Sequence, residues 1–108
     1  MKQETYEQAR HTLGLFYSDA STPADVTERY MKSLPLYERH RIAIGLLRHI
    51  VAHEGIAEIP KDLHTCFACC IDSLNFLVAN KTVPECELAS LSECVAVGKD
   101  MLGKVKII

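Results

Sequence analysis

The residues of this chain best suited to chemistry are three cysteines and a histidine that fall within seven positions. They form the pattern His64-x-Cys66-x-x-Cys69-Cys70. Two thiolates three residues apart can hold a zinc ion or carry out redox chemistry. Structural zinc sites supply a second such pair, however, and the other two cysteines, Cys86 and Cys94, are eight residues apart. A thioredoxin-like role needs a strand before the helix, which the sequence does not indicate. We therefore expect buried, structural cysteines.

Two further histidines, His49 and His53, are four residues apart and would face the same way on a helix. Such a pair can share a metal ion, but the metalloprotease pattern has Glu directly after the first His, where this chain has Ile50. One alternative hypothesis is a metal-binding module that combines His49 and His53 with Cys66 and Cys69 of the cysteine cluster. The leading prediction includes no metal and no cofactor.

Basic side chains are concentrated in the middle of the chain, over residues 29–53, whereas both flanks are acidic. Arg39, Arg41 and Arg48 are predicted to form an outward surface for another protein with an acidic surface. A nucleic-acid binder acting through the basic face of a helix over 36–53 is the second alternative. It is disfavoured because the whole chain has a net charge of −2 and because that helix has few side chains suited to reading base edges.

No arrangement typical of a catalytic site is visible. The sequence has no G-x-S-x-G element, no phosphate-binding glycine loop and no dinucleotide-binding fingerprint. Its serines have no neighbouring base that would activate them. We therefore predict that the chain is not an enzyme.

The composition is that of a small globular domain. The chain has 108 residues, of which 48% are hydrophobic and 24% charged, and a single domain over 1–108 can bury a core without metal or disulfides. The odd number of cysteines suits the reducing cytoplasm, and the amino terminus lacks the apolar segment of a secretory signal. Without an apolar run of about 20 residues, no membrane association is expected. The predicted location is the cytoplasm.

Apolar periodicity predicts an all-α, compact bundle of about five helices and no strand. The central helix spans about 60–80, where apolar side chains cover most of the circumference. The other helices are expected over about 3–18, 22–34, 36–53 and 82–103. Gly55 and Thr82 are predicted to cap the third helix at its end and the fifth at its start. The tail 104–108 is expected to fold back into a groove, to fray as a mobile end, or to add to a partner's surface.

The later helices carry more apolar surface than one stripe each requires, and a homodimer would cover it. The interface is predicted either at Ile50, Cys69 and Phe76, or at Cys94, Val97 and Met101. Most of the four tyrosines, Tyr6, Tyr17, Tyr30 and Tyr37, are predicted at the edge of the core with their hydroxyls in water. Together these features predict a small cytoplasmic protein–protein interaction or regulatory module, such as an adaptor, inhibitor or accessory protein of the phage or mobile-element type.

Overall fold

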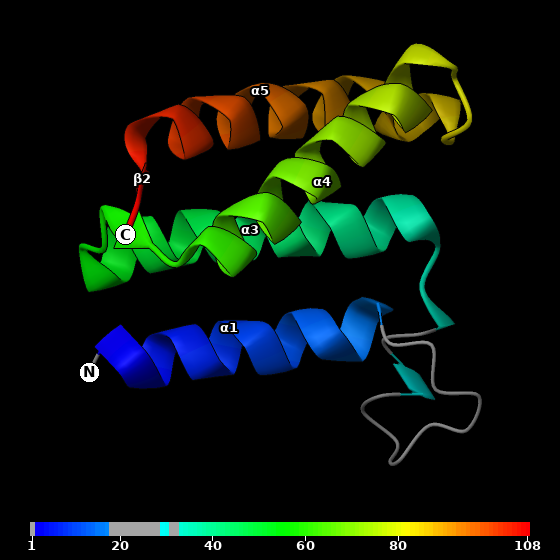
Figure 1. Ribbon diagram of the computed structural model, residues 1–108. Helices are drawn as coiled ribbons and strands as arrows, with labels where there is room; N and C mark the ends of the chain where they lie inside the picture. Colours follow the sequence, from blue (N-terminus) through cyan, green and yellow to red (C-terminus); the bar gives the residue numbers. More distant parts are fainter. Residues whose placement is uncertain (1, 18–28, 31–32) are drawn as a thin grey trace.

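The computed structural model describes residues 2–17, 29–30 and 33–108, and these are mostly helical (Figure 1). The elements in chain order are α1 (Lys2–Tyr17), α3 (Leu36–Glu54), β1 (Glu58–Ile59), α4 (Lys61–Ala79), the short 3-10 helix η1 (Glu85–Glu87), α5 (Leu88–Lys104) and β2 (Lys106–Ile107). The all-α prediction is confirmed. The number of about five helices is wrong for the described residues, which contain four α-helices, and most of the helix predicted over 22–34 lies outside them.

The central helix is α4, as predicted, and it packs against both α3 and α5. In Figure 1, α3 and α4 lie between α1 on one side and α5 on the other. The buried residues of α4 recur at steps of three and four, which gives it one broad inner face. They are Leu63, Phe67, Cys70, Ile71 and Leu74. By length and composition alone α4 could cross a membrane, but these five side chains are buried in the core of the folded chain.

The core has two adjoining parts. The first joins α1 and the tail to α3 and α4, with Leu47 and Phe67 at its centre. The second lies between α3, α4 and α5 and contains Ile44 and Leu91. α1 contributes to the first part only, through the buried line that its periodicity predicts. Tyr6, Ala9 and Leu13 of this line belong to the first part of the core, and Phe16, which continues the line, is also buried.

α5 comes close to α3 and α4 at the buried residue Gly98. A Cβ atom at this position would lie 3.0 Å from a methyl carbon of Ile44 and 3.0 Å from a side-chain carbon of Ile71. Contacts this short are tighter than nine in ten of those that Cβ atoms make in proteins, so Ile44 and Ile71 would have to shift by a few tenths of an ångström to admit a side chain. Glycine at 98 therefore permits the three helices to meet at this depth.

Two helix ends test the predicted caps. α3 ends at Gly55, which has the left-handed conformation (φ 66°) of a C-terminal cap, as predicted. The predicted start of the fifth helix at Thr82 is wrong, since α5 begins at Leu88 after η1. The reason is that the Thr82 hydroxyl donates to the carbonyl of Leu77 (3.1 Å) at the end of α4. Thr82 thus closes the preceding helix.

The carboxyl-terminal tail folds back onto the body of the protein. β2 pairs in parallel with β1, with Glu58 opposite Lys106 and Ile59 opposite Ile107. Val105, just before β2, is buried in the first part of the core. The prediction of no strand is therefore wrong here, and of the three alternatives for the tail the structure has the one in which it folds back. Two strands of two residues each are too short to show the alternation by which a strand is found in a sequence.

Candidate functional site

A groove of about 360 Å³ between α3 and α5 contains two of the three arginines predicted to bind a partner. Arg41 and Arg48 are two turns apart on α3 and face the same way. Gly45 lies between them, is exposed, and leaves the middle of the groove open because it has no side chain. The other lining residues are Ile44 of α3 and Ser90, Glu93, Cys94 and Val97 of α5.

The two arginines of this groove differ in how far their charge is compensated. Arg41 pairs with Glu38 on its own helix and with Glu87 of η1, whose Oε2 is 3.0 Å from Arg41 Nη1. The hydrogen bond that Arg41 donates to Glu38, with the charges of both carboxylates, raises the pKa of Arg41. Arg48 is exposed, and the described part of the chain contains no salt bridge to it. Arg48 is thus the cation available to a partner.

Arg39, the third predicted arginine, belongs to a different part of the structure. Its Nε donates to the carbonyl of Leu34 (3.0 Å) and its Nη1 to the carbonyl of Phe16 (3.3 Å). Phe16 is in the last turn of α1, where carbonyls lack helical partners and a positive charge is favourable. Arg39 therefore ties the end of α1 to the start of α3. Its predicted place in one outward surface with Arg41 and Arg48 is corrected accordingly.

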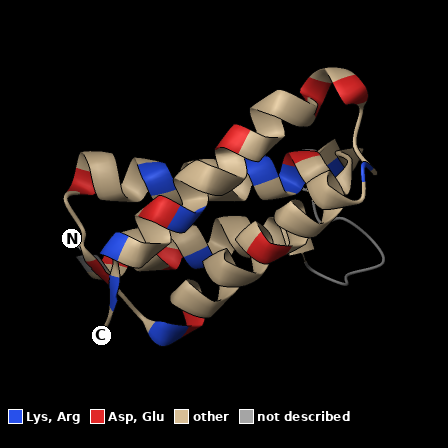
Figure 2. Cartoon of the chain, turned by 90° about the horizontal axis from the view of Figure 1, so that it is seen from above, with Lys and Arg blue, Asp and Glu red and all other residues tan. Residues whose placement is uncertain are grey.

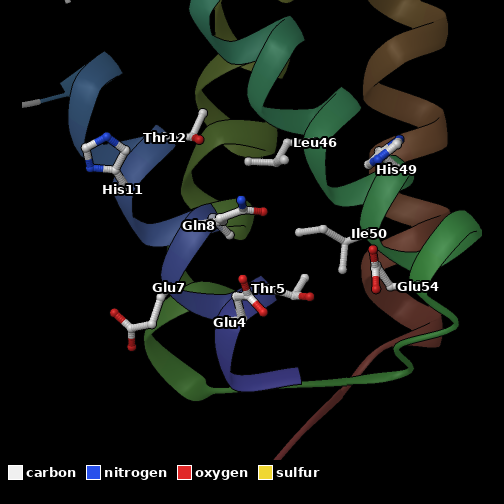
Figure 3. A pocket seen from close by; sticks show the side chains of 11 residues that line it. Glu4, Thr5, Glu7, Gln8, His11, Thr12, Leu46, His49, Ile50 and Glu54 are labelled. Carbon is white, nitrogen blue, oxygen red and sulfur yellow. The ribbon is translucent and has the colours of Figure 1, made fainter. Parts of the chain in front are cut away.

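A larger groove, of about 610 Å³, opens between α1 and α3 (Figure 3). Its rim is polar and includes Glu4 from α1 with His49 and Glu54 from α3, whereas Leu46 and Ile50 form an apolar wall. In Figure 3, Glu7 and His11 point away from α3. The remaining lining residues are Thr5, Gln8, Ala9 and Thr12.

His49 at this rim and His53, one turn further along α3, do not form the metal site considered from the sequence. The rings of His49 and His53 are adjacent, with centroids 4.4 Å apart, as their spacing requires. Both are exposed, whereas Cys66 lines a separate groove between α1 and α4. Within residues 2–17, 29–30 and 33–108, no three His, Cys, Asp or Glu side chains are placed to hold a metal ion together. The combination of His49 and His53 with Cys66 and Cys69 is therefore wrong.

A polar chain inside the core was missed by sequence reasoning. The Tyr17 hydroxyl lies 2.9 Å from Nδ1 of the buried His40, with the two rings stacked, and Cys70 Sγ lies 3.3 Å from the same hydroxyl. Burial raises the pKa of Tyr17, and burial followed by the charge of Arg39 lowers the pKa of His40. The prediction that the Tyr17 hydroxyl is in water is wrong. The available signal was His40 itself, since a histidine in an apolar helix line needs a polar partner.

The cysteines differ in exposure more than predicted. Cys70 is buried, Cys66 and Cys94 are half-buried, and Cys69 and Cys86 are exposed. Cys66 and Cys70 are one turn apart on α4. The neighbouring Cys70 thiol lowers the pKa of Cys66 to about 7, whereas the neighbouring Cys66 thiol and burial raise the pKa of Cys70. The expectation of buried, structural cysteines holds for Cys70 alone.

The residues predicted at a dimer interface are scattered. Phe76 is 66% exposed and shares a hollow with Leu36, which is 49% exposed. Cys69, two turns before Phe76, is also exposed. On α5, Val97 lines the α3/α5 groove and Met101 packs against the first part of the core. Ile50 is only 4% exposed, so its inclusion in an interface is wrong.

Comparison of the chain with protein-family models, with curated proteins and with solved structures found no match. The site therefore supplies the basis for a functional proposal.

Proposed function

We propose that this protein is a protein-interaction module whose α3/α5 groove binds an acidic segment of a partner protein. The observation that carries the proposal is Arg48, an exposed cation with no ion pair in the described part of the chain, beside a groove with a partly apolar lining. A guanidinium binds a carboxylate through two parallel hydrogen bonds, which fixes the partner's orientation as well as its charge.

The shape of the groove indicates what lies next to that carboxylate. Gly45 leaves space beside Arg48, and Val97 and Ile44 present apolar carbon around it. A partner side chain of moderate size, such as Leu or Val, fits this place while its neighbouring Glu or Asp meets Arg48. On the α5 side of the groove, the carboxylate of Glu93 repels a carboxylate of the partner. The partner's acidic residues are therefore directed to the α3 side.

The charge distribution favours a protein over a nucleic acid as partner. Glu38 and Glu87 compensate Arg41, and Glu93 adds negative charge at the groove. In Figure 2, basic and acidic segments are interspersed along the helices, and the described residues form no continuous basic band. A phosphate backbone requires several uncompensated cations in a row, whereas a single partner carboxylate requires one.

The proposal extends to the protein's role and assembly. The module has no catalytic activity of its own, acts in the cytoplasm as an adaptor, inhibitor or other regulatory protein, and forms a homodimer.

The exposed face of Cys69, Phe76 and Leu36 is the surface that supports self-association, since large apolar side chains gather there. Phe76→Asp is expected to reduce the sedimentation mass to that of a monomer. An unchanged mass for the folded variant would refute the dimer.

The groove is tested with a synthetic probe peptide, an amphipathic helix with Glu on one face and Leu on the other. Its amide chemical-shift changes on the labelled protein are expected at Gly45, Arg48 and Ser90. Arg48→Glu should weaken binding at least about tenfold, because a hydrogen bond to a charged group contributes about 1.5–3 kcal/mol. The control, Lys99→Glu, makes the same charge change on α5 outside this groove. Equal weakening by both variants would contradict the proposal.

A further inference from the structure

One end of the α1/α3 groove is flanked by two carboxylates, one from each helix. The two helices are antiparallel, since Arg39 joins the end of α1 to the start of α3. At the other end, the Tyr6 hydroxyl of α1 donates to the carbonyl of Glu58 (2.6 Å), shortly after α3 ends. Glu4 in the first turn of α1 and Glu54, the last residue of α3, therefore lie at the same end of the groove (Figure 3).

The charge of these two carboxylates is not compensated. Glu4 and Glu54 are exposed, and the described part of the chain contains no ion pair to either of them. Glu7, by contrast, pairs with Arg10 (2.9 Å) and points away from α3. Among the described residues, no Lys or Arg lines this groove. The carboxyl end of α3 adds negative partial charge, because its last carbonyls lack helical partners. This end of the groove therefore attracts a cation.

Beside the two carboxylates, the groove offers apolar carbon. The half-buried Leu46 forms part of its wall, and the buried Ile50, one turn further along α3, closes the floor. Each helix lines the groove over eight residue steps, from Glu4 to Thr12 on α1 and from Leu46 to Glu54 on α3. Eight steps of helix are about 12 Å long, which is the length of about four residues of extended chain. A short peptide segment therefore fits this groove.

From this arrangement we infer that the α1/α3 groove is a second docking surface, which binds a short basic segment of a partner protein. A Lys or Arg of that segment meets Glu4 and Glu54, and an aliphatic neighbour packs against Leu46. The methylene stem of the basic side chain covers further apolar surface while its charged head stays at the rim. The same two carboxylates repel an acidic segment, so this groove and the α3/α5 groove select opposite charges.

The two grooves lie on opposite sides of α3. Arg41 of the α3/α5 groove and Ile50 of the α1/α3 groove are nine residues apart, which is two and a half helical turns. In Figure 1, α1 and α5 accordingly lie on opposite sides of α3. Both grooves can therefore be occupied at once, and the module would join a basic segment to an acidic one. This consequence rests on the proposed acidic partner, whereas the basic docking surface does not.

The test uses the full chain, labelled for amide chemical shifts, and a capped hexapeptide in which Lys and Leu alternate. At millimolar peptide, shift changes are expected at Gln8, Thr12 and Ile50, whereas a hexapeptide with Glu in place of Lys should leave these amides unchanged. Changes confined to other parts of the chain would overturn the proposal. Changes at the same three amides on raising the protein concentration without peptide would also overturn it, because a second copy of the chain would then be the occupant.

A double variant, Glu4→Gln with Glu54→Gln, removes both charges with little change of shape. The dissociation constant of the Lys/Leu hexapeptide should rise about 2- to 25-fold, because each exposed ion pair contributes a factor of about 1.4–5. The matched control, Asp72→Asn with Glu85→Gln, removes two exposed carboxylates outside this groove and changes the net charge equally.

Equal weakening by the two double variants would overturn the proposal, since the net charge of the protein would then govern binding. The acidic probe that tests Arg48 should bind the Glu4→Gln, Glu54→Gln variant as it binds the original chain. Failure of the basic docking surface is therefore distinguishable from failure of the proposed function.

Discussion

Gly98→Ala is the substitution that most sharply tests the packing of the three central helices. The added methyl group would meet carbons of Ile44 and Ile71 at 3.0 Å, with a second carbon of Ile71 at 3.2 Å. Overpacking of this kind costs about 1–3 kcal/mol. Replacing glycine by alanine inside a helix stabilises the folded state by about 0.5–1 kcal/mol, because alanine has the higher helix propensity. The net expectation is a loss of up to about 2.5 kcal/mol in the free energy of unfolding.

Gly45→Ala provides the matched control, because Gly45 is also inside a helix but has no atom within 4 Å of the added Cβ. The helix contribution is common to both substitutions, so the difference in stability between the variants measures packing alone. Urea unfolding followed by circular dichroism should show Gly98→Ala less stable than Gly45→Ala by about 1–3 kcal/mol. A difference below about 0.5 kcal/mol would contradict the expected packing penalty, because effects of independent substitutions add only to within about that amount.

Three further predictions concern stability. Gly55→Ala should cost about 1–2 kcal/mol, measured by urea unfolding, because alanine is strained in the left-handed conformation. His40 has a lowered pKa when folded, so below about pH 6.5 the unfolded chain binds a proton that the folded chain does not. Stability should therefore fall from pH 7 to 5.5, and less steeply in His40→Gln; equal slopes would contradict this. Val105→Ala should speed hydrogen exchange of the Lys106 amide, which donates to Ala57; an unchanged rate would argue against the docked tail.

Apolar periodicity was sufficient to predict α1, α3 and α4, because each of these helices buries one continuous face. The buried line from Leu63 to Leu74 and the Gly55 cap follow directly from residue spacing and backbone preference. The close approach at Gly98 was not predictable in this way. A glycine inside a helix shows only that a side chain is absent, and which helix occupies the space is decided by tertiary packing.

The candidate sites were predicted less well than the fold, for a related reason. Helical spacing placed Arg41 and Arg48 on the same face of α3, as the structure has them. Glu87, which compensates the charge of Arg41, comes from a distant segment of the chain. The contact of Tyr17 with His40 likewise joins two helices far apart in the chain. One-dimensional patterns report which residues share a face of one helix. They do not report which face of another helix lies opposite.

The most direct test of the proposed function is a charge exchange across the α3/α5 groove, measured as the dissociation constant of the probe peptide. Arg48→Glu is expected to weaken binding of the Glu-containing peptide and to gain affinity for a peptide in which Lys replaces Glu. Lys99→Glu should change neither affinity by a comparable factor. If Arg48→Glu binds both peptides as the original chain does, Arg48 does not contact the partner and the groove is not its binding site.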